Sequence, residues 1–331
     1  MQHKKDWIRM LVVVMLIPLI FLSLVLFMML FNVQRYPENQ EGILLQQYER
    51  LSHIEGRKII VVGDETTAYG VDPDLLEQEI GLPAAVIGHQ SAHGTLPYRL
   101  ALRQAKTGDI LVVAPNYYMW KSIDFQKDEA LAALDGRPDL LVSFNWREMT
   151  ALLNRLPAFF CKKLNRKIDE TFKQTVNHLE KTDPINSPLF IDGRPSRTIE
   201  GEAVPLTEAE KEDPGKTYNF FLFNFSDETL DFFNEYRQLA DRKGVDLLFS
   251  FPALYKEATI GEPELMDSLA EEITIRTGIE AISRPSSFLF EGDEMAGNIF
   301  LCNSKGIKRR TTILALDLKT YLEGKGEGIY D

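Results

Sequence analysis

The chain has few of the residues that most often carry catalysis or metal binding. Its 331 residues contain five histidines and two cysteines, Cys161 and Cys302, and no histidine follows His178. There is no C-x-x-C pair or His/Cys cluster, so we expect no metal and no cofactor. The cysteines lie far apart in sequence. Two alternatives stay open for them, a disulfide in an extracytoplasmic domain or two unpaired buried thiols.

The chain also lacks a basic stripe. It carries a net charge of −12; the first 35 residues carry +3, from four positive charges and one negative, which leaves −15 for the rest. Because nothing in this acidic remainder neutralises phosphates, we expect no nucleic-acid partner. No internal repeat or low-complexity tract is present, and about 295 residues suit one large domain or one domain with an insertion.

A long apolar run near the N-terminus predicts a membrane anchor. Residues 10–31 are apolar except for Pro18 and Ser23, and about 20 residues suffice to cross a bilayer. Basic residues precede the run, which predicts a cytoplasmic tail at 1–9 and an extracytoplasmic domain after Arg35, in a single-pass protein of the cell membrane. A cleaved signal peptide is the alternative, but its apolar core has only about 7–15 residues before small residues at a cleavage site.

After a stem at 32–56 with a short helix at 39–51, strand and helix signals alternate. One helix is fully delimited by Asp72 as N-cap, Pro73 in the first turn and Gly81 at its end. Such alternation predicts right-handed crossovers and a parallel sheet, and therefore a three-layer α/β domain at 57–331. The expected strands are 58–62, 84–87, 109–114 and 245–251; the expected helices are 71–81, 94–105, 226–243, 262–277 and 303–322.

Residues 121–216 interrupt this alternation. They contain helical segments at 146–156 and 167–178, followed by a span rich in Pro, Gly and Asp at 182–214. We interpret the stretch as an insertion or lid over the sheet edge. A functional loop and partial disorder remain equal alternatives for residues 182–214.

The segment from Ile59 reads IIVVGDETTAYGVD, a hydrophobic strand that runs into a Gly-Asp turn. A D-P-x-L-L-E helix, a short strand and two glycines six residues apart follow it. This segment, with 108–118 and 298–322, resembles the SGNH (GDSL-type) hydrolase superfamily. The resemblance implies a flavodoxin-like fold. It also implies kinship with the membrane-anchored, extracytoplasmic accessory proteins of bacterial surface-polysaccharide and teichoic-acid acylation.

The same resemblance implies where the reactive groups would stand. The nucleophilic serine falls on Glu65, and the groups that would stabilise an oxyanion fall on Gly88 and Asn116. The general-base histidine falls on Leu301, and its aspartate on residue 297 or Asn298. Acyl transfer needs a nucleophile, an oriented base and oxyanion donors. Only the donors remain, so we predict a catalytically degenerate site.

Two arrangements would restore chemistry and define the alternative, an active esterase or O-acyltransferase with a rearranged site. His89 and His93 flank Ser91 after the second strand, although all three also fit a plain loop. Asp64 and Glu65 would act as paired carboxylates, although acidic residues at a helix N-terminus are common capping groups.

Aromatic residues after the third strand predict a binding site. Tyr117, Tyr118 and Trp120 follow it directly, at the sheet edge where ligands bind in open α/β folds. Asp64, Glu65 and His89 belong to the same edge. Apolar ring faces beside carboxylates suit sugars, although part of such a cluster often lies in the core.

From these features we expect a membrane-anchored accessory or glycan-binding factor in bacterial envelope polysaccharide assembly or O-acylation. Its partners would be the membrane, through the N-terminal helix, and an envelope glycan or a membrane acyltransferase. A scaffold for a membrane enzyme, acting through the anchor and residues 121–216, is a third hypothesis.

Overall fold

The structure is a computed structural model that describes residues 7, 10, 14–21, 23, 40–89, 94–123, 125–177, 190–191, 194–195, 218–219, 225–296 and 299–326. It divides into two compact units. Residues 1–37 and 127–185 form the helical unit, and residues 38–126 and 186–331 form the sheet unit. The predicted anchor at 10–31 lies only partly within the described residues, and among these no helix has the length and apolarity needed to cross a membrane.

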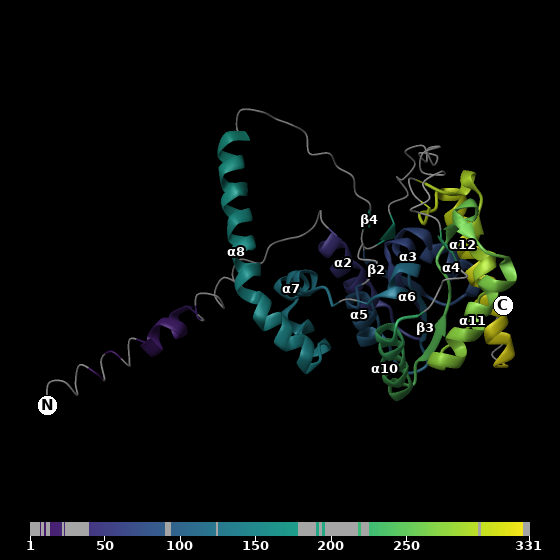
Figure 1. Ribbon diagram of the computed structural model, residues 1–331, viewed down its shortest axis with the longest axis horizontal. Coiled ribbons are helices and arrows are strands. Elements are labelled where there is room, and N and C mark those ends of the chain that lie inside the picture. The colour runs from purple at the N-terminus through teal and green to yellow at the C-terminus, as the bar shows by residue number, and fades with distance from the viewer. Residues whose placement is uncertain are drawn as a thin grey trace. The chain divides into compact units, whose positions relative to one another are not determined.

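The sheet unit is built on a five-stranded parallel sheet (Figure 1), which confirms the predicted α/β class. The strand order is β10-β7-β3-β1-β2, and every neighbouring pair is parallel. The strands are β1 (Ile59–Asp64), β2 (Ala84–His89), β3 (Ile110–Ala114), β7 (Asp246–Phe249) and β10 (Glu280–Ala281).

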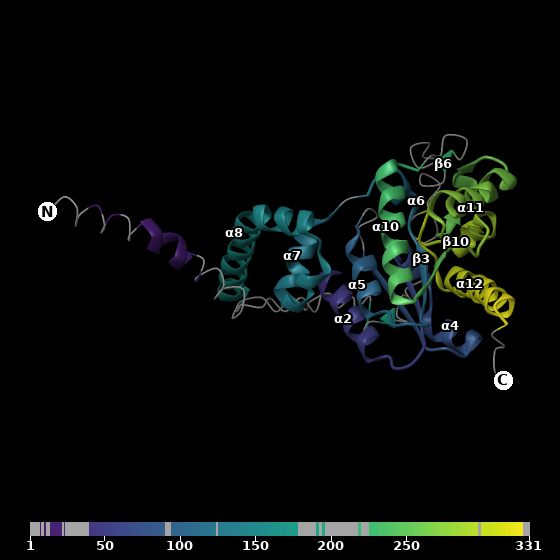
Figure 2. The ribbon, with the colours of Figure 1, turned by 90° about the horizontal axis from the view of Figure 1, so that it is seen from below.

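Helices cover both faces of this sheet. On one face, Val61 of β1 packs in a common core with Leu76 of α4 (Pro73–Ile80) and Leu314 of α12 (Ser304–Gly324). On the other face, Phe233 of α10 (Asp227–Lys243) contacts both Phe249 of β7 and Tyr98 of α5 (Leu96–Gln104). Figure 2 shows α5 and α10 on one side of the sheet and α4 and α12 on the other. The arrangement is compatible with a three-layer α/β domain.

The helix ends follow the local signals in the sequence. Asp72 accepts hydrogen bonds from the backbone N–H of Asp74 and Leu75 at 2.9 and 3.2 Å, and Gly81 ends α4 with φ 79°. Ser226 caps α10, which Gly244 ends with φ 66°. Positive φ suits glycine because it has no Cβ to clash. The predicted boundaries of these two helices are confirmed.

The remaining elements of the sheet unit are shorter or peripheral. Helix α2 (Gln40–His53), which we expected in a stem, packs on β2 instead, and α11 (Pro263–Thr277) packs beside β10. Of the span 182–214, four residues are described, as an antiparallel pair of short strands. The short elements are β4 (Phe190–Ile191), β5 (Arg194–Pro195), β6 (Tyr218–Asn219), β8 (Leu254–Tyr255), β9 (Thr259–Ile260), β11 (Leu289–Phe290), η4 (Lys256–Ala258), η5 (Pro285–Phe288) and η6 (Gly292–Glu294).

The helical unit contains α7 (Lys127–Gly136), η1 (Pro138–Ser143) and α8 (Trp146–Asn177). The predicted helical segments at 146–156 and 167–178 are confirmed up to Asn177, and they belong to one helix, because α8 runs continuously through Pro157. An internal proline removes one backbone hydrogen bond and clashes with the preceding turn. Ion pairs lie on both sides of the proline: Arg155 and Lys162 each lie 2.6 Å from a carboxylate oxygen of Asp128 on α7. These pairs hold both segments of α8 against the same partner helix.

Candidate functional site

The turn that joins β1 to α3 (Glu65–Gly70) lies at the carboxyl edge of the sheet. Asp64 is buried and caps α3: its Oδ1 accepts hydrogen bonds from the Thr66 backbone N–H at 3.0 Å and from the Thr66 hydroxyl at 2.7 Å. The Thr67 hydroxyl donates to the carbonyl of Ala114 on β3 at 2.9 Å. Neither threonine hydroxyl is therefore available as a nucleophile.

A buried arginine on α12 completes this turn, and our prediction of site residues did not include it. Arg310 is almost fully buried and donates a hydrogen bond through Nη1 to the backbone carbonyl of Thr66. A Cβ on Gly70 would collide with the same Nη1, so the glycine leaves room for the guanidinium. The sequence did contain a signal, since Arg310 occupies an inward position of α12 between Ile307 and Leu314.

The buried charges of Asp64 and Arg310 influence each other. Burial raises the pKa of the Asp64 carboxyl, while Thr66, the Asn116 side chain and the positive charge of Arg310 act in the opposite direction. Burial lowers the pKa of Arg310, and Asp64 is among the groups that oppose this shift. Since each ion is costly to bury alone, these groups form one interdependent structural network.

Glu65, at the predicted nucleophile position, is the first residue of α3 and is half-buried. Burial, followed by the negative charge of Asp64, raises the pKa of Glu65 to about 7. Glu65 in turn contributes to the raised pKa of Tyr69, one helical turn further on, whose main cause is burial. A carboxyl with such a pKa exchanges protons close to neutral pH, which is a property of general acids and bases.

This titration predicts a pH-dependent effect of the Glu65→Gln substitution. Because folding raises the pKa of Glu65, its contribution to stability is fully present below its ordinary value of 4.5 and is lost as the pH rises through about 7. The stability of the variant relative to the native chain should therefore increase by about 1–2 kcal/mol across this window, after allowance for solvent screening. Urea unfolding at a series of pH values measures it, with Glu77→Gln on exposed α4 surface as a matched control. A difference independent of pH would contradict the assignment.

Both oxyanion candidates make hydrogen bonds within the fold, but only Gly88 does so as a donor. The Gly88 backbone N–H donates to Oε1 of buried Gln47 on α2 at 2.9 Å, and a Cβ at Gly88 would lie 2.5 Å from the carbonyl oxygen of Asp64. The Asn116 Oδ1 accepts from the Tyr118 backbone N–H at 3.0 Å and caps α6 (Tyr117–Lys121). The Gly88 N–H is therefore not a free donor, whereas the capping bond of Asn116 occupies its amide oxygen and not the amide N–H groups that would face an oxyanion.

The structure brings the ends of β1, β2 and β3 together but separates the three predicted aromatic ligand residues. In the parallel register Asp64 faces His89, and Gly63 faces Ala114. Tyr117 and Trp120 are fully buried, and Trp120 stacks on Phe225 with ring centroids 4.6 Å apart. These two residues form core, so a ligand at the surface cannot reach them and their prediction as ligand contacts is corrected.

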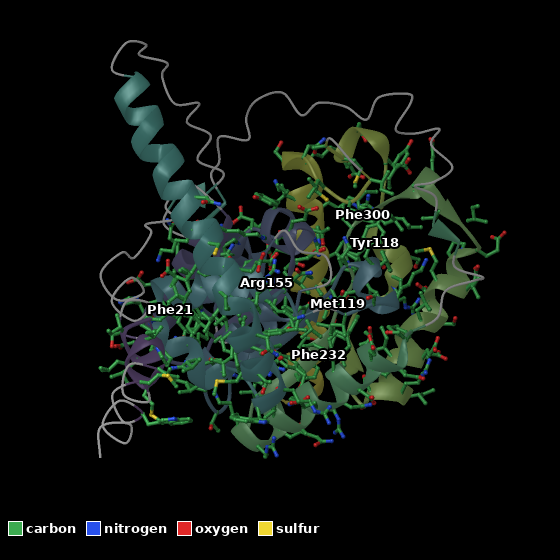
Figure 3. The ribbon with its side chains drawn as sticks, turned by 60° about the vertical axis from the view of Figure 1, so that its left-hand side comes forward. Phe21, Tyr118, Met119, Arg155, Phe232 and Phe300 are labelled. Atoms are coloured by element: carbon green, nitrogen blue, oxygen red, sulfur yellow. The ribbon has the colours of Figure 1, made fainter. Side chains whose placement is uncertain are left out.

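Tyr118 is the predicted aromatic that remains accessible. It is 40% exposed, and its ring meets the edge of Phe300 at a centroid distance of 5.5 Å (Figure 3). Sequence reasoning missed Phe300, which precedes the position assigned to the family's histidine. A partly exposed ring that is held by contact with a second ring can stack on a ligand.

The remaining predicted positions contribute no identified reactive group. Leu301 is half-buried and apolar, whereas Ser91, His93 and Asn298, together with the His89 side chain, lie outside the described residues. Both cysteines are free thiols. Burial raises the pKa of Cys302 to about 12, so this thiol stays protonated at neutral pH. Within the described ranges, no three His, Cys, Asp or Glu side chains are grouped as metal ligands.

A separate pocket of about 380 Å³ lies between β10 and the C-terminal half of α12. Its lining includes Glu280, Asp317, Tyr321 and Lys325, and none of the residues at the β1–α3 turn. Lys325 already pairs with Asp246 at 2.8 Å and lies over the Tyr321 ring. The pocket is therefore distinct from the candidate site at the strand ends.

No protein-family model and no curated protein matches this sequence. The resemblance to SGNH hydrolases stays a prediction.

Proposed function

We propose that this chain is a membrane-anchored, extracytoplasmic SGNH-hydrolase-like protein that binds glycan as an accessory factor in bacterial envelope polysaccharide assembly or O-acylation, and that it does not transfer acyl groups itself. One observation carries the proposal. At the turn where such an enzyme would activate its nucleophile, Oδ1 of Asp64 and the hydroxyls of Thr66 and Thr67 are hydrogen-bonded within the fold.

The electrostatics of the turn also favour a non-catalytic role. An oxyanion that forms during acyl transfer needs donors or positive charge close by. Here the nearest ionisable groups after β1 are the carboxyls of Asp64 and Glu65, and an ionised Glu65 would repel such an oxyanion. The Arg310 guanidinium does not offset this at the surface, because it is buried beneath α3.

Glycan binding fits the groups that remain accessible at this edge. The exposed face of Tyr118 can stack on the C–H face of a sugar ring, while a carboxylate such as Glu65 accepts hydrogen bonds from its hydroxyls. The sheet unit carries 23 basic and 39 acidic residues, a net charge of −16. Such a surface disfavours polyanionic ligands, so we expect an uncharged stretch of glycan.

A binding assay with two Tyr118 variants tests this function. We expect Tyr118→Ala to weaken the affinity for uncharged envelope glycan by about tenfold, since ring stacking contributes on the order of 1 kcal/mol. Tyr118→Phe keeps the ring and should bind as the native chain does. Isothermal titration of the full chain in detergent measures both, and equal binding by all three proteins would contradict a role for the ring.

An active hydrolase is the second candidate, favoured by the raised pKa of Glu65. In that case Glu65 would act as a general base that activates a water molecule. Hydrolysis of p-nitrophenyl acetate by the full chain distinguishes the two. We expect no turnover above the buffer rate from the native chain or from Glu65→Ser, because a restored serine still lacks a base. Turnover by the native chain that Glu65→Gln abolishes would establish the hydrolase.

A further inference from the structure

The helical unit exposes several large apolar side chains at one place in its sequence. Val142 is 79% exposed and Leu141 46%, both at the end of η1; Trp146 is 77% exposed at the start of α8, and Leu153, two turns further on, is 61% exposed. We call these four residues the α8 stripe. Single exposed apolar residues are ordinary, but a group of them that includes a tryptophan indicates an interaction surface.

The stripe does not belong to the face of α8 that packs on α7. That face carries buried Leu152 and Phe159 and ends at Lys163, whose ammonium lies 2.6 Å from the carboxylate of Asp135 on α7. Trp146 and Leu153, seven residues apart, share a different side of the helix, as the α-helical repeat requires. Helix α8 therefore has two apolar sides: one packs on α7, and the other is exposed.

The charge of the chain is divided unequally between the two units. The helical unit contains 14 basic and 10 acidic residues, a net charge of +4, whereas the sheet unit carries −16. Residues 1–37 carry +3 of this charge, and residues 127–185, with ten basic and nine acidic residues, carry +1. Helix α8 holds seven of these basic residues, three of which (Arg155, Lys162 and Lys163) pair with acidic residues of α7. A strong charge asymmetry between two parts of one chain indicates an anionic partner for the basic part.

We propose that the α8 stripe inserts into the interface of an anionic lipid bilayer. Basic helices with an exposed apolar side bind such surfaces through buried apolar area together with attraction to anionic headgroups. Tryptophan is enriched at the level of the headgroups. The helical unit also includes residues 1–37, which contain the apolar run predicted to enter the membrane. This inference does not depend on the proposed glycan binding.

Trp146 provides a reporter for the test. The full chain is reconstituted in phosphatidylcholine vesicles with or without phosphatidylglycerol, using brominated acyl chains that quench tryptophan on contact. Subtracting the emission of Trp146→Phe removes the contributions of Trp7 and Trp120. We expect the Trp146 emission to be blue-shifted and strongly quenched in the anionic vesicles, and less so without phosphatidylglycerol or at high salt.

Variants that keep the reporter test the apolar part of the stripe. The double substitution Val142→Ser with Leu153→Ser should reduce the quenching of Trp146 at least severalfold, while Ile275→Ser, at an 82% exposed position of α11 in the sheet unit, should leave it unchanged. Circular dichroism verifies that each variant is folded. The proposal is overturned if Trp146 is unquenched in both types of vesicle. It is also overturned if the quenching of Trp146 is the same with and without phosphatidylglycerol. Cross-linking of two chains through residue 146 without quenching would instead make the stripe a contact between copies.

Discussion

We expect the Arg310→Met variant to lose about 3–5 kcal/mol of unfolding free energy at neutral pH, because it removes a buried, charge-assisted hydrogen bond to Thr66 together with the positive charge that offsets part of the cost of burying Asp64. Arg310 is buried, donates to the backbone of Thr66 and opposes the cost of burying Asp64. Methionine fills most of the volume of the side chain without its charge. The loss should therefore report electrostatics and hydrogen bonding more than a cavity.

A double-mutant cycle with Asp64→Asn separates these contributions in urea unfolding. The double variant should be less destabilised than the sum of the single variants, since the neutral amide that replaces the Asp64 carboxylate no longer needs a cation. Folding already raises the pKa of Asp64, and loss of Arg310 raises it further. A carboxyl with a raised pKa destabilises the fold as the pH rises, so the deficit of Arg310→Met should shrink on acidification. Lys308→Met, on the exposed side of α12, is the matched control; strict additivity in the cycle would contradict the network.

The elements that the sequence predicts well are those determined by local physics. The α4 and α10 boundaries depend on residues next to each helix, namely Asp72 and Gly81 in one case and Ser226 and Gly244 in the other. The apolar spacing along α12 likewise corresponds to its inward face, where Thr311, Leu314 and Leu318 are buried. Propensity, capping and periodicity are all encoded within a few residues, so no knowledge of distant contacts is needed.

The errors concern residues whose environment is set by distant parts of the chain. Helix α8 continues through Pro157, and Asp128 of α7, more than 25 residues earlier, binds side chains on both sides of the proline. Trp120 is core rather than ligand contact because Phe225 and Phe251 enclose its ring. In each case a tertiary contact overrides the local pattern.

The candidate site shows the same division. Sequence spacing placed Asp64, Glu65 and Asn116 at one sheet edge, and the parallel register brings the ends of their strands together. Sequence spacing could not indicate that Gln47 of α2 accepts a hydrogen bond from the Gly88 N–H, because the two residues are 41 positions apart. Nor could it indicate that Arg310 lies beneath α3, since Arg310 is 244 positions from its partner Thr66. Gln47 and Arg310 therefore reach this site only in the folded chain, and local sequence patterns do not reveal them.

We expect an equally large loss of stability when Lys163 of the helical unit is replaced. Its ammonium lies 2.6 and 2.7 Å from the two carboxylate oxygens of Asp135, and both side chains are buried. We expect Lys163→Met to destabilise α7 and α8 by about 3–5 kcal/mol, because Asp135 would remain buried without its cation. Lys162→Met changes a neighbouring, exposed lysine whose pair with Asp128 is partly solvated, and should cost at most about 1 kcal/mol.

Hydrogen exchange measured by mass spectrometry locates each effect along the chain. Lys163→Met should reduce protection most in α7 and α8, whereas Arg310→Met should do so most in β1, α3 and α12, so that each variant is the control for the other. Adding Asp135→Asn to Lys163→Met should restore much of the protection, since a neutral amide is far less costly to bury than a lone carboxylate. If Lys162→Met and Lys163→Met gave equal losses, burial of the Lys163–Asp135 pair would not be what holds α8 on α7. If Asp135→Asn restored nothing, packing of the lysine stem would account for the loss instead.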